Sequence, residues 1–346
     1  MDQAAAILVL VILLVLVFDF TNGFHDAADM IATSIASRAM KPGMAIVLVT
    51  LFTFLGPFIG GLAVADTIGQ FVHVQGLPPL FAESIVLAAI LAAITYNLLT
   101  WKLGLPTSSS NSLVGGLIGA GLCALGADSV NWGVTALLQG RLTGVAKIVT
   151  GLFFSPLAGF LAGFLLMGLF LRMFRRLSFR SNRLFVLSQY CTVAWLSFTH
   201  GTNDAQKGMG IIGMLLFSAH HTSSFVIPDW VVIICASAIT LGTLFGGWSI
   251  IRTMGFGLYK VRTVHSVADQ IGSALVISGA TAIGAPVSTT QVVTSTLLGI
   301  GTREKPRHVH WATALAIVRG WLFNLPISAL TGALFMYCFK LLQDTP

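Results

Sequence analysis

Two similar polar strings, each with one aspartate, interrupt strongly apolar sequence about half the chain apart. They are FTNGFHDA at 20–27 and FTHGTNDA at 198–205. An unpaired carboxylate at the depth of a bilayer costs about 3 kcal/mol, so two at matching positions indicate a function. Carboxylates, amides and free backbone carbonyls are hard oxygen ligands that suit a small cation. The residues that we expect to hold one, with sodium as a candidate at Asp26 and Asp204, are Asn22, His25, Asp26, Asp29, Asn203 and Asp204.

Three residues near these strings leave alternatives open. Asp29 is a cation ligand, a proton carrier or a solvated charge, and His25 is a proton-responsive group or a satisfied interior histidine. Lys207 shares a helix face with Asp204, three residues earlier, so it either pairs with that aspartate or contacts an anion. The glycines in both strings, Gly23 and Gly201, predict that the helices unwind there, near 20–26 and 200–207.

A second pair of strings carries proline and consecutive hydroxyl residues. They are GLPTSSSN at 104–111 and GAPVSTTQ at 284–291, each ahead of an apolar helix. Proline suits the first turn of a helix and serine or threonine caps it. A helix start inside a membrane presents N–H donors and a positive dipole end to an anion. The predicted oxyanion ligands are Thr107, Ser108, Ser109, Ser110, Asn111, Ser288, Thr289, Thr290, Gln291 and Lys207. The alternative is that these small residues serve only helix packing.

The elements that position these strings are membrane helices. The chain has 346 residues, of which 55% are hydrophobic and only 9% charged, and its mean hydropathy is +0.88. We expect an all-α polytopic membrane protein without a cofactor. The predicted apolar segments are 4–37, 44–65, 82–101, 111–127, 144–173, 184–217, 230–250, 266–283, 290–300 and 311–341, with kinks at Pro156 and Pro326.

The matching order of the strings divides the chain into two transmembrane repeats, 1–173 and 184–346, joined by a basic cytoplasmic linker at 174–183. Most lysines and arginines lie in four loops that the positive-inside rule places in the cytoplasm, and the loops 66–81 and 219–229 contain none. Both termini then lie outside, and the halves have opposite orientation. The net charge of +7 therefore reports topology and no nucleic-acid partner. We expect a multi-pass protein of the inner (plasma) membrane with the lipid bilayer around it, and a homodimer is left open.

The four strings together resemble the inorganic phosphate transporter (PiT) family, over essentially the whole chain. The run 204–208, DAQKG, is similar to the bacterial low-affinity branch. The resemblance implies symport of inorganic phosphate with protons or sodium: the hydroxyl strings would hold the anion and the aspartates the coupling cations. The chain departs from the family pattern at Asn111 and Gln291, where histidine is common, and at Asp29 and Thr202.

Inverted repeats with broken polar segments are typical of secondary transporters that alternate access around a midplane site. We therefore predict an ion-coupled phosphate symporter with two Pro-Ser/Thr hairpins. The alternative is a sulfate or other oxyanion permease of the same fold. An anion channel ranks lower because the polar residues cluster at four points instead of lining a path. No nucleophile elbow or metal motif supports an enzyme.

Overall fold

The structure, a computed structural model, describes residues 3–71, 77–127, 130–176, 182–219, 221–222 and 224–343. These parts contain thirteen α-helices. Five of them, α1, α2, α4, α7 and α13, are long and apolar enough to cross a membrane, and α9 with α10 would add a sixth span bent by 67°. The expected all-helical membrane fold is confirmed.

The helices of the first half are α1 (Gln3–Ala36), α2 (Pro42–Ile59), α3 (Ala63–Gly69), α4 (Pro79–Lys102), α5 (Ser109–Leu125), α6 (Val134–Leu138) and α7 (Gly144–Met173). Those of the second half are α8 (Asn182–Ser218), α9 (Asp229–Phe245), α10 (Trp248–Gly257), α11 (Thr263–Ala282), α12 (Thr289–Glu304) and α13 (Trp311–Gln343). The predicted segments 44–65 and 230–250 are thus each divided into two helices, and α3 occupies part of the predicted loop 66–81. Pro156 and Pro326 lie inside α7 and α13.

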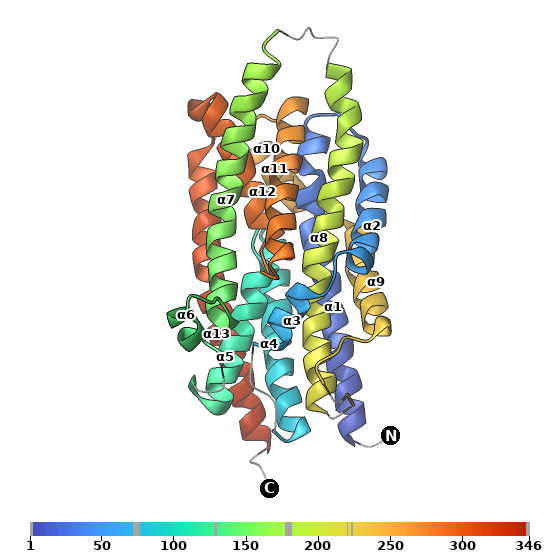
Figure 1. Ribbon diagram of the computed structural model, residues 1–346, viewed down its shortest axis with the longest axis vertical. Helices are drawn as coiled ribbons and strands as arrows, with labels where there is room; N and C mark the ends of the chain where they lie inside the picture. Colours follow the sequence, from blue (N-terminus) through green and yellow to red (C-terminus); the bar gives the residue numbers. More distant parts are fainter. Residues whose placement is uncertain are drawn as a thin grey trace.

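Both chain ends lie at one end of the molecule, and the turn from α7 to α8 lies at the other, here called the linker end (Figure 1). Much of the predicted linker, 177–181, lies outside the described residues. The flanking helices end at Met173 and begin at Asn182, and the linker with its cytoplasmic location stays a prediction.

Two helical hairpins enter the bundle from opposite ends. The hairpin α4–α5 comes from the end with the termini and α11–α12 from the linker end, and their tips approach each other at mid-height (Figure 1). The tips are the segments 103–108 and 283–288, where the Pro-Ser/Thr strings stand. Each second helix begins with a serine N-cap: Ser108 Oγ accepts from the Asn111 amide at 3.1 Å, and Ser288 Oγ from the Gln291 amide at 3.3 Å. The serine side chains thereby satisfy backbone donors that the interrupted helices leave open.

The expected breaks near 20–26 and 200–207 are wrong, because α1 and α8 continue through both strings. The glycines have another use. A Cβ on Gly23 would lie 1.9 Å from the carbonyl oxygen of Ile239 in α9, and one on Gly201 would lie 2.1 Å from that of Thr53 in α2. Glycine at these positions lets two backbones touch. The helix breaks that membrane transporters place at their sites occur here at the hairpin tips.

Contacts between helices occur in corresponding pairs. Helix α1 packs against α9 as α8 packs against α2, and α5 packs against α13 as α12 packs against α7. The short helices follow the same rule, since α3 packs against α8 and α10 against α1. Each half therefore completes its packing with helices of the other half. The inverted relation of the two halves stays a prediction that this pairing supports.

Candidate functional site

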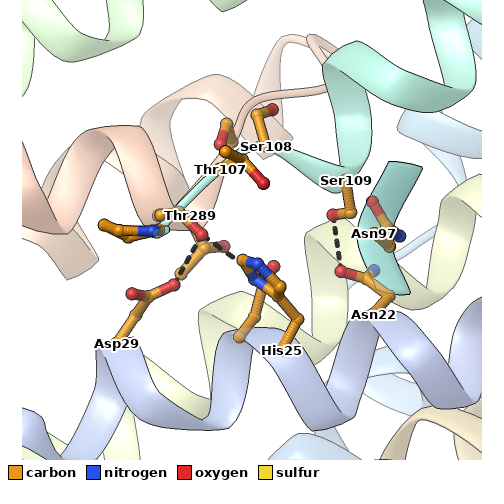
Figure 2. A network of polar contacts seen from close by, with 12 residues as sticks. Asn22, His25, Asp29, Asn97, Thr107, Ser108, Ser109 and Thr289 are labelled. Carbon is orange, nitrogen blue, oxygen red and sulfur yellow. Dashed lines mark hydrogen bonds and ion pairs between the residues drawn. The ribbon is translucent and has the colours of Figure 1, made fainter. Parts of the chain in front are cut away.

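The polar strings meet at the centre of the bundle, where the starts of α5 and α12 face the middle of α1 and α8. Figure 2 shows Asn22, His25 and Asp29 on one face of α1, pointing toward the segments that carry Ser109 and Thr289. Spacings of three and four residues place these side chains on one helical face. All sixteen predicted site residues are buried.

In the first half, α1 binds both hairpin tips. Ser109 Oγ donates a 2.6 Å hydrogen bond to Asn22 Oδ1. Thr290 Oγ1, from the other tip, lies 2.6 Å from Asp29 Oδ2 and 3.1 Å from Asp26 Oδ1. His25 Nδ1 lies 3.1 Å from the same Asp26 oxygen. One threonine hydroxyl thus lies between the two carboxylates that the sequence places three residues apart, and its single hydrogen serves one of them at a time.

In the second half, α8 makes matching contacts with different residue types. His200 Nδ1 lies 3.2 Å from Thr289 Oγ1 and 3.7 Å from Asp204 Oδ2. Lys207 Nζ lies 2.7 Å from Asp204 Oδ1 and 2.5 Å from Ser110 Oγ. Of the two roles left open for Lys207, the structure shows the ion pair with Asp204.

The two sets of aspartates are close enough to act as one site. Asp26, His200 and Asp204 each offer a ligand atom, and these atoms lie within 4.8 Å of one another. Asn22 joins the sets, because its Nδ2 donates to Asp204 Oδ2 at 3.3 Å. Asp29 Oδ1 has no hydrogen-bond partner. Carboxylate oxygens at this depth without enough donors form an arrangement that a cation would neutralise.

Other predicted residues have structural contacts. The amide of Asn203 donates to Thr281 Oγ1 at 2.8 Å and to the Ala285 carbonyl at 3.3 Å, and its Oδ1 accepts from the Val287 amide at 3.2 Å. Asn203 therefore fixes the tip 283–288 to α8. Thr107 donates to Thr100 Oγ1 at 2.8 Å, within its own hairpin. The hydroxyls of Ser108 and Ser288 act as the N-caps described above.

Asn111 and Gln291 lie somewhat apart from the carboxylates. Both line a cavity of about 550 Å³ between α5, α7, α12 and α13 whose other walls are mainly apolar. Their side-chain oxygens, Asn111 Oδ1 and Gln291 Oε1, have no hydrogen-bond partner. Asn111 and Gln291 thus line the same cavity, and their contact with the anion stays a proposal.

Three buried residues near the site were not predicted from the sequence. His200 lies in the second polar string, four residues before Asp204, and this spacing puts both on one helical face. Asp19 and Asp269 are fully buried, and neither carboxylate has a hydrogen-bond partner that satisfies the usual geometry. Asp19 precedes Asn22 by three residues within the same apolar run, and this spacing could have revealed it.

Charged residues beyond the candidate spans form a network at the linker end. Glu304 accepts from Tyr259 Oη at 2.8 Å, pairs with Arg262 and lies 2.6 Å from His265 Nε2. The hydrogen bond from His265, with help from Tyr259 and Arg262, lowers the pKa of Glu304 to about 2. This network ties the end of α12 to the start of α11 and so anchors the base of the second hairpin.

The chain is similar to known proteins over nearly its full length. A family model described as "Phosphate transporter family" matches residues 22–332. A "Probable low-affinity inorganic phosphate transporter" of Bacillus subtilis is 40% identical, over 99% of this chain and 100% of the relative. A protein of the same description from Rhizobium meliloti is 39% identical over 99% of both chains.

Two further matches are more distant. The "Low-affinity inorganic phosphate transporter PitB" of Escherichia coli is 32% identical, over 61% of this chain and 46% of that protein. A solved structure entitled "The sodium-dependent phosphate transporter" matches with a TM-score of 0.76 and 23% identity, over 97% of this chain and 99% of the other. At that identity the structural likeness shows a common fold.

Proposed function

This chain belongs to the phosphate transporter family, and from that premise we propose that it is a secondary active symporter of inorganic phosphate. Transport would alternate access around the central site. Its relatives are transporters, so the expectation of a non-enzymatic protein agrees with the family. Membrane helices and family membership make it a multi-pass membrane protein. We place it in the inner (plasma) membrane with both termini outside.

The observation that carries the proposal is the meeting of two helix starts, rich in hydroxyl groups, with three buried carboxylates. Ser109, in the first hairpin, contacts Asn22 of α1, and Thr289, in the second hairpin, contacts His200 of α8. Helix starts and hydroxyl groups suit an oxyanion, and carboxylates suit the accompanying cation. A site with both components favours the two ions entering together.

Charge explains why the two ions should be coupled. A divalent phosphate entering alone would add two negative charges beside Asp26, Asp29 and Asp204, of which only Asp204 has a lysine partner. Cation entry would offset this repulsion before the site closes. Two monovalent cations per divalent phosphate would be electroneutral, and a third would add about 2.3 kcal/mol of driving force per 100 mV.

The coupling ion is a proton or sodium, and different observations support each. The buried groups His25, His200 and Asp29 could take up protons, since all three have ring or carboxylate atoms without partners. Sodium is supported by the printed title of the solved structure with the same fold and by the neighbouring carboxylates of Asp26 and Asp29, which both contact Thr290 and of which Asp29 Oδ1 has no hydrogen-bond partner.

Uptake of labelled phosphate into proteoliposomes tests the proposal. Gradients of sodium and of pH are imposed separately, with sulfate and arsenate as competitors. We expect accumulation above the external concentration under one gradient, inhibition by arsenate and weak inhibition by sulfate. Counterflow of unchanged phosphate separates transport from catalysis. Equilibration without accumulation under either gradient would contradict symport, and stronger competition by sulfate would assign the protein to a different oxyanion.

A further inference from the structure

The two halves of the site place residues of opposite charge at corresponding positions. Asp29 follows Asp26 by three residues on α1, and Lys207 follows Asp204 by three residues on α8. Each of the two contacts a hydroxyl at the same position of a Pro-Ser/Thr string. Asp29 contacts Thr290, in the string 284–291, and Lys207 contacts Ser110, in the string 104–111. A carboxylate in one half thus stands where an ammonium group stands in the other.

The ammonium of Lys207 has three oxygen partners. Its Nζ lies 2.7 Å from the Asp204 carboxylate, 2.5 Å from the Ser110 hydroxyl and 3.1 Å from the Val287 carbonyl. A lysine has three N–H donors, so all of them have a partner, and the side chain is fully buried. A carboxylate, a hydroxyl and a backbone carbonyl are the oxygen ligands that hard metal cations also prefer.

The corresponding place in the first half lacks a fixed cation. Thr290 bridges Asp26 and Asp29, and Asp29 Oδ1 has no partner although the side chain is buried. Two carboxylates that share one hydroxyl repel each other in a medium of low dielectric constant. This half therefore carries the negative charge that an exchangeable cation would compensate.

We propose that the ammonium of Lys207 is a tethered cation that permanently occupies the cation position at Asp204, so that this half of the site exchanges no metal ion. The exchangeable coupling cation binds in the other half, at Asp26 and Asp29. The assignment of an exchangeable ion rests on the proposed function, whereas the tethered ammonium does not. Lys207 then determines how many cations accompany each substrate ion.

Two substitutions of Lys207 separate its charge from its volume. Lys207→Ala removes the charge and leaves space among three oxygen ligands, which sodium can fill. Lys207→Met also removes the charge but fills the space with an apolar side chain. Lys340→Ala is the matched control, because Lys340 is only half-buried and its ammonium donates to the Cys123 and Ala124 carbonyls at 2.8 and 2.9 Å, at the end of α5 far from Ser109.

The first measurement is thermal unfolding of the purified full-length protein without phosphate, in sodium chloride against choline chloride at equal ionic strength. In choline, Lys207→Ala and Lys207→Met should both unfold at lower temperature than the unmodified protein, because Asp204 loses its partner. Sodium should raise the unfolding temperature of Lys207→Ala by more than it raises that of the unmodified protein. It should not restore the unfolding temperature of Lys207→Met. Lys340→Ala should respond to sodium as the unmodified protein does.

A double variant keeps the test decisive if Lys207→Ala is too unstable in choline. Asp204→Asn with Lys207→Ala removes both charges, so it should fold without sodium and lose the added sodium response. Phosphate binding gives a second measurement: the affinity of Lys207→Ala for phosphate should rise as sodium fills the vacant position and should level off once sodium exceeds its dissociation constant. Equal sodium responses of Lys207→Ala and Lys207→Met, or a full added response in the double variant, would overturn the inference.

The same data separate this inference from the proposed function. Sodium rescue of Lys207→Ala without phosphate concerns the cation position alone. Failure of the unmodified protein to accumulate phosphate in proteoliposomes would refute the symporter and leave the tethered ammonium standing. Normal phosphate symport with no selective rescue of Lys207→Ala would refute the tethered ammonium and leave the symporter standing.

Discussion

Ser109, at the start of α5, donates a 2.6 Å hydrogen bond to the side-chain oxygen of Asn22 in the middle of α1. The bond joins a hairpin tip to a helix that runs through the whole bundle (Figures 1 and 2). Its counterpart in the other half is the 3.2 Å contact between Thr289 and His200. In the alternating access that we propose, movement of a tip would break these contacts or carry them along.

Removing either hydroxyl should weaken phosphate binding. In Ser109→Ala and Thr289→Ala a donor to a desolvated anion is lost, worth about 1.5–3 kcal/mol, which corresponds to about a ten- to a hundredfold loss of affinity. Isothermal titration of the purified variants with phosphate measures the effect. Ser237→Ala is the control, because its hydroxyl bonds only the Ile233 carbonyl of its own helix. Unchanged affinity in both variants would refute the site built from paired helix starts.

The central aspartates should be required for coupling. Asp26→Asn and Asp204→Asn each remove a charge that the cation or Lys207 offsets, so gradient-driven phosphate uptake should be abolished in proteoliposomes. Glu83→Gln is the control, since Glu83 is a buried carboxylate in α4 beyond its first turn. If both asparagine variants accumulate phosphate with unchanged sodium and pH dependence, these carboxylates are structural and coupling lies elsewhere.

Residues at the start of α8 and just after its end should be accessible to labels from opposite sides of the membrane. In a background without the four native cysteines, Ser224→Cys should react with an impermeant maleimide on intact cells. Asn182→Cys should react only after permeabilisation, because the basic residues at the linker end belong in the cytoplasm. Both positions are exposed. Reaction of both from outside would be incompatible with the inverted arrangement of the two halves.

The glycines of the polar strings should be needed for helix packing. In Gly23→Ala the added Cβ would lie 1.9 Å from the Ile239 carbonyl oxygen, and in Gly201→Ala 2.1 Å from that of Thr53. Because the obstacle is backbone, relief needs movement of a whole helix, and we expect a loss of about 1–3 kcal/mol in stability. Gly43→Ala is the control, with no atom within 4 Å of the new Cβ. Thermal unfolding should show lower midpoints for the first two variants only.

Acid should weaken the network at the linker end through Glu304. Its pKa is lowered to about 2 in the folded protein, against about 4.3 in an unfolded chain. Its contribution to stability is therefore complete above about pH 4.3 and is lost as the pH falls toward 2. Unfolding midpoints measured across this range should fall less steeply in Glu304→Gln than in the unmodified protein. A parallel decline in both would show that other groups cause the acid sensitivity.

Much of the architecture could be predicted because a bilayer imposes strict rules on sequence. Long apolar runs, such as the one that became α7, must be helices, since each backbone donor needs a partner within its own segment. The hydroxyl residues also gave the starts of α5 and α12 to within about two residues, because capping is a local interaction. Pro106 and Pro286 lie before the N-caps and not in the first turn as expected. The expected unwinding at Gly23 and Gly201 was wrong because glycine alone does not distinguish a helix break from a close helix contact.

The sequence by itself indicated which residues are candidates for a function, since carboxylates and hydroxyl strings inside apolar helices are costly wherever they lie. Only the tertiary structure decided how they pair: Ser109 with Asn22, Thr290 with Asp29, and Lys207 with Ser110, from positions 87, 261 and 97 residues apart. Tertiary packing also directed Asn111 and Gln291 toward a separate cavity. Local patterns specify helices and their ends, but the partners of a buried polar group depend on how distant helices pack, and no short-range rule contains that information.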